Sequence, residues 1–193
     1  MIQAVIDAGV LQQIPIFRNL TRNECDQIFS VASIVEVAQG QIVLQQGHRS
    51  QNLWIILEGQ CEVFRVNGQS KPENIPKNSI VEKIVLAQLG PHNHFGEMSF
   101  FQSAPHSASV CALETGKLLC IKRADFDALI DRGDLAPYKL AFNVIDSLAD
   151  RLRKMDQWVS RLVEHDNQDA VTPARQTSEW QIFRTKILTE WNL

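Results

Sequence analysis

The spacing of the hydrophobic residues changes twice along this chain of 193 residues, and this change limits the possible folds more than any other feature. Between residues 33 and 122, apolar and polar residues alternate in short runs, as in "SIVEVAQGQIVLQQG" and "NLWIILEGQCEVFRV". Before and after this region, apolar residues recur every three to four positions. Alternation is typical of half-buried strands, and the longer spacing is typical of amphipathic helices. We therefore expect a β domain with helices on both sides.

Glycines divide the alternating region into short strands. The pattern predicts one strand on each side of Gly40, a hairpin at Glu58-Gly59, a polar loop at 67–79 and a last hairpin at 114–116. About six to eight strands at roughly 8–12-residue spacing are typical of an antiparallel sandwich or jelly roll. The predicted fold class is α+β and mainly β: an antiparallel jelly roll flanked by N-terminal helices and a long C-terminal helix.

The flanking segments contain helix signals. In residues 1–32, Thr21 and Glu24 have the T-x-x-E spacing of a capping box, which predicts a helix start. Residues 33–136 are expected to form the jelly-roll domain, which includes a short helix at 124–131, "ADFDALID".

A long helix is predicted at 137–164. Its apolar residues follow the spacing of a heptad seam, at Tyr138, Ala141, Ile145, Leu148, Leu152, Met155, Val159 and Leu162. Such a helix can lie on its own domain or pair with a second copy. A helix that packs on its own domain usually has a wider apolar face, so the narrow seam favours a homodimer through 138–162.

The last part of the chain divides into a linker and a short helix. Residues 165–178 are polar and without periodicity, which is typical of a linker. Residues 179–193 are predicted to form an amphipathic helix with Trp180 and Trp191 on its apolar face. That face needs burial against this domain, the dimer mate or another protein partner.

The composition excludes several classes of protein. A net charge of −3 argues against nucleic-acid binding through bulk basic charge. No apolar run is long enough to span a membrane, and the N-terminus lacks the features of a signal peptide. The four cysteines are scattered without a C-x-x-C pair, which favours a reducing, cytoplasmic location.

The stretch "FGEMSFFQSAPHSASV" at 95–110 has the composition of a phosphate cradle. Gly96 lets the backbone approach a ligand closely, and the successive amides after it can form a concave nest for phosphate oxygens. The candidate ligand-binding residues are Phe95, Gly96, Glu97, Met98, Ser99, His106, Ser107 and Ala108.

The order of these elements resembles the cyclic nucleotide-binding domain family of catabolite activators and protein kinase regulatory subunits. The resemblance covers about residues 11–163 and rests on "IPIFRNLTRNE", "GQIVLQQG", "LWIILEGQCEV", "LAQLGPHNHFGEMSFF", "APHSASVCAL" and "SLADRLRKM". It implies a regulatory domain without a cofactor, whose ligand is cAMP or cGMP. It also implies that Glu97 accepts a hydrogen bond from the ribose 2′-hydroxyl and that Ser107 adds a donor.

Two positions depart from the family pattern. His106 stands where the family has an arginine that pairs with the cyclic phosphate. Loss of such a charge-assisted contact costs about 2–3 kcal/mol, or about 30–150-fold in affinity. The ordinary histidine pKa is near 6.5, so binding through a protonated His106 would strengthen as pH falls. Met155-Asp156 also replaces a hydroxyl pair that touches the purine.

These departures leave two interpretations of function. The first is a sensor with weakened or altered binding of a cyclic nucleotide. The second is a degenerate domain that binds no nucleotide and serves as a dimeric scaffold for protein interaction. His106 is the residue that separates them.

The sequence also bears on two unrelated classes, metal enzymes and DNA-binding proteins. His92, His94 and Glu97 resemble part of a cupin metal site, but their spacing is too short and no second motif follows. Many bacterial members of the family carry a C-terminal helix-turn-helix, whereas only about 30 residues follow Leu162 and they show no recognition helix. The sequence therefore does not predict DNA binding. It contains no Ser/His/Asp set and no P-loop, so it does not predict catalysis either.

Overall fold

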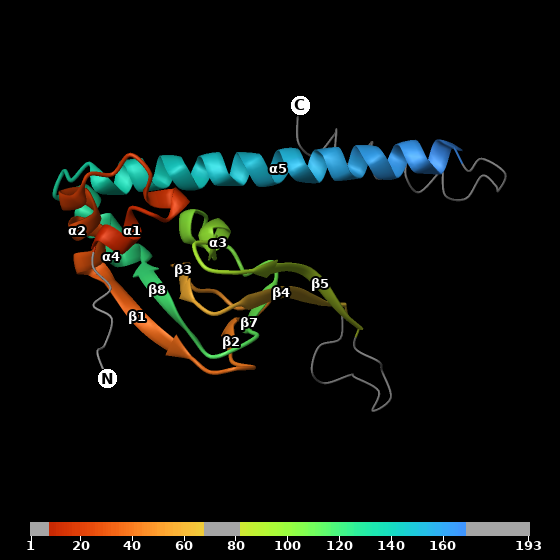
Figure 1. Ribbon diagram of the computed structural model, residues 1–193, viewed down its shortest axis with the longest axis horizontal. Helices are drawn as coiled ribbons and strands as arrows, with labels where there is room; N and C mark the ends of the chain where they lie inside the picture. The colour runs from red at the N-terminus through yellow and green to blue at the C-terminus, as the bar shows by residue number, and fades with distance from the viewer. Residues whose placement is uncertain (1–7, 68–81, 169–193) are drawn as a thin grey trace. The chain divides into compact units, whose positions relative to one another are not determined.

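The computed structural model describes residues 8–67 and 82–168 (Figure 1). Its helices are α1 (Ala8–Leu11), the 3-10 helix η1 (Pro15–Phe17), α2 (Arg22–Val31), α3 (Glu97–Phe101), α4 (Arg123–Asp131) and α5 (Ala136–Gln168). Its strands are β1 (Ala32–Val37), β2 (Ile42–Leu44), β3 (Asn52–Glu58), β4 (Cys61–Asn67), β5 (Glu82–Leu89), β6 (His94–Phe95), β7 (Ser109–Ala112) and β8 (Gly116–Lys122). The chain divides into two compact units, 1–147 and 148–193, with the boundary inside α5.

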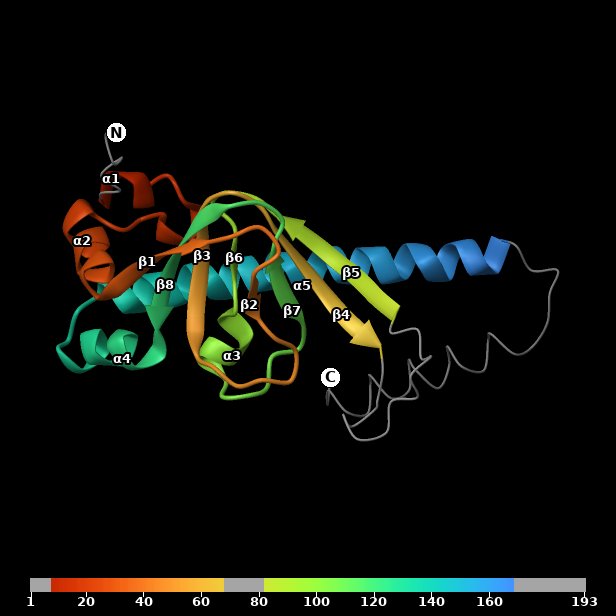
Figure 2. The ribbon, with the colours of Figure 1, turned by 90° about the horizontal axis from the view of Figure 1, so that it is seen from below.

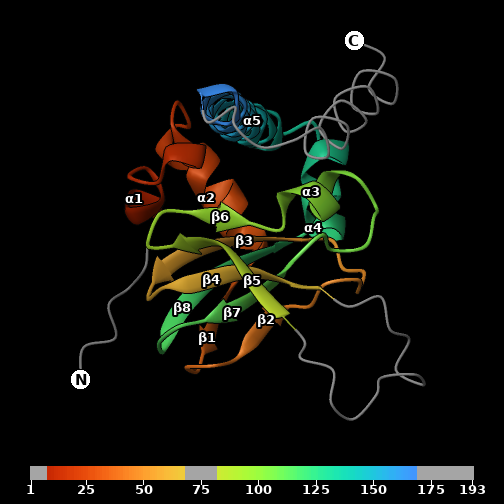
Figure 3. The same ribbon diagram turned by 90° about the vertical axis from the view of Figure 1, so that its right-hand side faces the viewer.

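The strands form two antiparallel four-stranded sheets, which Figure 3 shows as stacked layers. One sheet has the order β1-β8-β3-β6 and the other has the order β2-β7-β4-β5. Successive strands thus alternate between the two sheets over much of the chain, which is the arrangement of a jelly roll. The predicted fold class, α+β with an antiparallel jelly roll, is confirmed.

The two predicted hairpins are wrong. Strand β3 pairs with β8 and β6, whereas β4 pairs with β5 and β7, so the chain crosses between sheets at Glu58-Gly59. It crosses again between β7 and β8, at the predicted 114–116 turn. Gly59 and Gly116 are needed because the backbone segments of these two crossings lie in close contact. A Cβ atom on Gly116 would lie 2.2 Å from the carbonyl oxygen of Glu58, which leaves no room for a side chain.

The main hydrophobic core lies between the two sheets. Its buried members are Val37, Leu44, Trp54, Ile56, Cys61, Phe95, Val110, Ala112, Leu118 and Cys120. The other face of the β1-β8-β3-β6 sheet is also buried, because the intervening residues Leu53, Ile55, Leu119 and Ile121 are fully covered. Helices α2 and α4 contact β1 and β8 of this sheet.

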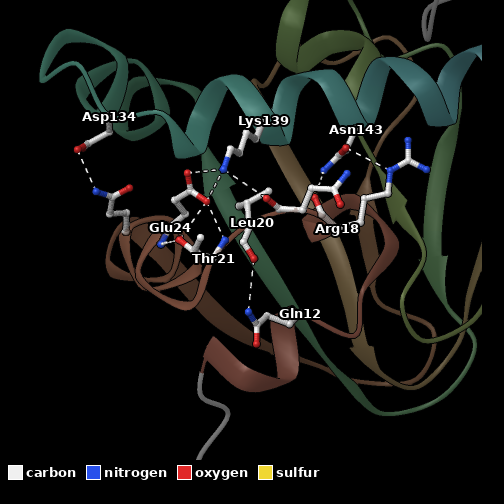
Figure 4. Close-up of polar contacts among 10 residues, drawn as sticks. Gln12, Arg18, Leu20, Thr21, Glu24, Asp134, Lys139 and Asn143 are labelled. Atoms are coloured by element: carbon white, nitrogen blue, oxygen red, sulfur yellow. Dashed lines mark hydrogen bonds and ion pairs between the residues drawn. The ribbon is translucent and has the colours of Figure 1, made fainter.

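The N-terminal helices are tied to the start of α5 by polar contacts (Figure 4). The capping box at Thr21 and Glu24 is present, and the Glu24 carboxylate also accepts a hydrogen bond from Lys139. This bond from Lys139, followed by the bond from the Thr21 backbone, lowers the pKa of Glu24. One turn further along α5, Asn143 donates from its side-chain amide to the carbonyl oxygens of Ile16 and Arg18, at 2.9 and 2.8 Å.

Helix α5 buries one face and leaves the heptad seam exposed. The buried residues near its start are Ala136, Leu140, Asn143 and Val144. The seam residues Tyr138, Ile145, Leu152 and Met155 are 48 to 59% exposed. Within the first unit, the seam residues Tyr138 and Ile145 are therefore not the residues through which α5 packs on the domain.

Some predicted segments differ from the structure or lie outside it. Helix α5 continues to Gln168, so residues 165–168 of the predicted linker are helical. The predicted tail helix at 179–193, the rest of the linker and most of the 67–79 loop lie outside the described residues. No helix in the described ranges is long and apolar enough to cross a bilayer.

Candidate functional site

The candidate site begins where β6 turns into α3. Gly96 has φ 84° and ψ 0°, the left-handed region that L side chains rarely adopt. A Cβ atom there would lie 2.5 Å from the carbonyl oxygen of Asn52 and 3.3 Å from Cδ1 of Trp54. Gly96 is therefore required by both its conformation and the close approach of β3, which lies beside α3 (Figure 2).

The amides of residues 97–99 follow this glycine at the start of α3. The Phe100 amide donates to the carbonyl oxygen of Gly96 at 3.0 Å. The three amides before it belong to the first turn of α3, where the helix itself offers no acceptors. Of the side chains here, Glu97 and Ser99 are buried and Met98 points outward, with 62% of its surface exposed.

His106 is buried and bridges two hydroxyl groups. Its Nδ1 lies 2.9 Å from Oγ of Ser99, and its Nε2 lies 2.8 Å from Oγ of Ser50. Ser99 donates its own proton to the carbonyl oxygen of Gly96 at 3.1 Å. Ser99 must then accept from Nδ1–H, and Nε2 accepts from the Ser50 hydroxyl. A neutral imidazole with its proton on Nδ1 satisfies all of these contacts.

The surroundings of His106 disfavour its charged form. Burial, and to a lesser degree the neighbouring His48, lower the pKa of His106 below its ordinary value. The direction is opposite to the one that a protonated phosphate contact needs. The role of His106 as a ligand contact stays a prediction, as do the roles of the other seven candidate residues.

The segment around His106 is held by the loop between β2 and β3. The Gly47 amide donates to the carbonyl oxygen of His106 at 2.9 Å, and the His106 amide donates to that of His48 at 2.8 Å. Ser107 is exposed, and its carbonyl oxygen accepts a hydrogen bond from Nε of Arg65 at 2.8 Å. Ala108 is half-buried beside it.

Trp54 lies against the Gly96 turn. Its ring stacks on Phe95, with centroids 6.3 Å apart and planes 12° apart. Its indole nitrogen is buried without a hydrogen-bond partner among the described residues. A buried donor of this kind is uncommon in proteins, and it lies next to the atom, Cδ1, that contacts the Gly96 turn.

The candidate site is connected to α4 through the end of α3. The ring of Phe100 meets the ring of Phe126 edge-on, with centroids 5.2 Å apart. At the start of α4, Arg123 donates from Nη1 to the carbonyl oxygen of Phe100 at 3.1 Å. A displacement of α3 would therefore act directly on α4.

The histidines of the cupin-like pattern lie in a turn and a short strand. His92 has a positive φ of 70° before β6, and His94 is buried within β6. Across the part of the chain that the structure describes, no three His, Cys, Asp or Glu side chains cluster closely enough to hold a metal ion.

The strands and the turn at Gly96 lie within a known family of domains. A profile of the cyclic nucleotide-binding domain matches residues 34–133, just over half of the chain. The chain belongs to the cyclic nucleotide-binding domain family. The resemblance stated from the sequence motifs is thereby confirmed.

Relatives within the family include regulators from bacteria and eukaryotes. The cyclic AMP receptor protein of Thermus thermophilus is 34% identical over 144 residues, which are 74% of this chain and 59% of the relative. The cAMP-dependent protein kinase regulatory subunit of Mycosarcoma maydis is 30% identical over 102 residues, 53% of this chain and 17% of the relative. The crystal structure of the Thermus thermophilus catabolite activator protein has a TM-score of 0.63 at 32% identity, covering 77% of this chain and 63% of that one. This chain thus spans less than two thirds of the length of these relatives.

Three residues beside the candidate segments 95–99 and 106–108 (the cassette) were missed in the sequence. Ser50 and Trp54 give no local signal, because they come from 40 to 60 residues away in the chain. Arg65 does leave a signal. It follows Cys61 and Val63 at spacing two, so a charge stands where the strand pattern predicts an inward side chain.

Proposed function

We propose that this domain is a non-enzymatic sensor that binds a cyclic nucleotide of the cAMP or cGMP type. Residues 95–99 and 106–108 hold the ligand, with the amides after Gly96 at the phosphate and Glu97 at the ribose hydroxyl. The observation that carries the proposal is the left-handed turn at Gly96, packed so closely on β3 that a side chain is excluded. Membership of the family supports the assignment of the ligand class.

Binding is weaker than in a cassette with arginine at position 106. A neutral imidazole whose two nitrogens already contact Ser50 and Ser99 has no donor left for a phosphate oxygen. The difference of about 2–3 kcal/mol corresponds to about 30–150-fold in affinity.

The signal passes from the cassette to α5 by a shift in population between conformations. Ligand at 97–99 favours one position of α3. The contacts of Phe100 with Phe126 and Arg123 support transmission of that position to α4. Helix α4 is followed after a short connection by α5, whose exposed seam is the surface for a homodimer. Residues 179–193 bind a protein partner. The protein acts in the cytoplasm and does not bind DNA.

A dimeric scaffold that binds no nucleotide is the second candidate. It is favoured by the same two observations about His106: the imidazole is buried, and both of its nitrogens are used within the protein. In that case the cassette is a structural turn and the exposed seam of α5 carries the function.

Calorimetric titration with cAMP, cGMP and cyclic dinucleotides separates the two candidates. The variants are wild type, His106→Arg and Glu97→Gln. A sensor binds cAMP or cGMP as wild type, binds more tightly as His106→Arg and loses about 10-fold in affinity as Glu97→Gln. Binding by His106→Arg alone supports the scaffold. If neither protein binds, the cassette does not hold these ligands and the sensor proposal fails.

A further inference from the structure

The cassette of this protein contains no cation at the position where the family has one. His106 is buried and bridged by two hydroxyls, and burial favours its neutral form. A cyclic phosphate carries a negative charge, and an arginine pairs with it better than any neutral donor. A cation for the phosphate would therefore have to come from another element of the fold.

Two arginines contact the backbone of the segment that contains His106. Arg65, on β4, donates from Nε to the carbonyl oxygen of Ser107 at 2.8 Å. Arg49, in the loop after β2, donates from Nη1 to the carbonyl oxygen of Ser103 at 3.4 Å. The bond of Arg49 is long, uses one end of its guanidinium fork and ends outside the candidate residues. The bond of Arg65 is short and ends on the residue next to His106.

The position of Arg65 on β4 turns it toward the space between the sheets. Pairing of β4 with β7 is regular from Cys61 to Phe64. The register shift between β4 and β5 at Val63 and Phe64 skips a residue of β5 and none of β4, and the pairing then continues past Arg65 to Asn67. Side chains of β4 therefore alternate between the two faces as far as Arg65. Cys61 and Val63 belong to the core between the sheets. Arg65 continues this inward series at the end where the core stops, and its side chain is exposed.

The anchoring of Arg65 leaves its fork available. The bond to Ser107 uses the Nε donor, and the four donors on the two Nη atoms are not part of it. An arginine fixed in this way has lost part of its rotamer freedom before a ligand arrives. The Nη donors form the pair that matches two phosphate oxygens.

We propose that Arg65 supplies the cation that pairs with the phosphate of the bound nucleotide, in place of the arginine that His106 replaces. This inference rests on the proposed sensor function. The guanidinium comes from strand β4 instead of the segment before β7, and Ser107 positions it through its carbonyl oxygen. Arg65 thus makes anion binding compatible with a neutral residue at position 106.

Lys83 provides a matched control on the same sheet. It lies on β5 opposite Val66, one residue from the direct partner of Arg65, which is Ile84. Its ammonium group lies 4.5 Å from the centroid of the Phe64 ring and pairs with Glu62. Phe64 and Glu62 point to the outer face of the sheet, because they alternate with the inward residues of β4. Lys83 therefore places a positive charge, like that of Arg65, on the opposite face of the sheet.

The test is calorimetric titration of cAMP, cGMP and phosphate-free adenosine into wild type, Arg65→Gln, Arg65→Lys and Lys83→Gln. We expect Arg65→Gln to bind the cyclic nucleotide about 10- to 100-fold more weakly and to bind adenosine like wild type. The affinity of Arg65→Lys for the cyclic nucleotide should lie between those of wild type and Arg65→Gln, because lysine keeps the charge and lacks the paired Nη donors of the guanidinium group. Lys83→Gln should stay within about twofold of wild type. Thermal unfolding of each variant checks that the domain is intact.

Four results would overturn the role of Arg65. If wild type and Arg65→Gln bind the cyclic nucleotide equally, the sensor function stands and the assignment of Arg65 is wrong. If Lys83→Gln loses as much affinity as Arg65→Gln, the effect is a general one of positive charge. If adenosine binding falls in parallel, the substitution has damaged the structure of the site. If wild type binds neither cAMP nor cGMP, the proposed sensor function fails and this inference fails with it.

Discussion

The imidazole of His106 joins the cassette to a loop from a different region of the chain. Ser50 belongs to the loop before β3, and Ser99 belongs to α3. Ser99 is in turn bonded to the carbonyl oxygen of Gly96, at the left-handed turn. The histidine is thus a structural bridge between these two elements.

Acid should remove the stabilisation that this bridge provides. The pKa of His106 is lowered in the folded protein by burial first and by His48 second. The unfolded chain, with an ordinary pKa near 6.5, therefore binds the proton first as pH falls. The contribution of His106 is complete above about pH 6.5 and is lost as pH falls through 6.5 toward the lowered folded value.

Urea unfolding of wild type and His106→Asn across this pH range measures the effect. At neutral pH, His106→Asn should cost about 1–2 kcal/mol, because a bridge with two hydrogen bonds is shortened. The difference between the two proteins should shrink toward acid, where wild type loses its advantage. The other four histidines, including His48, are present in both proteins and largely cancel. If the free energies of unfolding of the two proteins change with pH in parallel, then the pKa of His106 is not lowered by folding.

At this scale, the sequence predicts what depends on the backbone and fails for partners far away in the chain. The need for glycine at position 96 follows from the local motif, and the structure has the left-handed turn there. The surroundings of His106 do not follow, because Ser50 is 56 residues away and nothing near it marks it as a partner. The direction of the His106 pKa shift depends on that burial, so the sequence could not predict it.

The elements of this domain are more predictable than their pairing. The helix start at Thr21 and most strands follow from capping and alternation, which are local properties. The turns at Gly59 and Gly116 have the sequence of hairpins, yet the strands around each turn belong to different sheets. Both glycines serve a close contact between two crossings, and glycine alone does not distinguish that role from a tight turn.

The joint between α5 and the N-terminal helices depends on one buried amide. Asn143 is only 6% exposed and donates to two backbone carbonyls of the segment that precedes α2 (Figure 4). Asn143→Leu keeps a similar branched shape but leaves both carbonyls without this donor. We expect it to lower the free energy of unfolding by about 2–4 kcal/mol, measured by urea denaturation.

Asp146 offers a contrast one turn along the same helix. It pairs with Arg18, but both side chains are 40 to 50% exposed. Asp146→Asn should cost no more than about 1 kcal/mol, because solvent screens an exposed ion pair. Equal effects of the two substitutions would show that the joint is held by surface charge and that the buried amide is not its main polar contact.

For the molecule as a whole, the faces of α5 differ in burial. The face with Ala136, Leu140 and Val144 is buried in the chain's own domain. The heptad face, with Ile145, Leu152 and Met155, is exposed in the single chain. Heptad spacing alone could not decide between packing on the domain and pairing with a second copy. Exposure of that face favours pairing with a second copy.

The prediction is that the protein is a dimer through this face with or without ligand. Sedimentation equilibrium should give about twice the chain mass of 21.8 kDa for wild type. Leu152→Glu puts a charge into the seam and should give a monomer, because a buried unpaired carboxylate is costly in an apolar interface. Lys154→Glu introduces the same group on the opposite face and should leave the dimer intact. A monomeric wild type, or a Leu152→Glu protein that remains dimeric, would mean that the exposed seam of α5 does not join two copies.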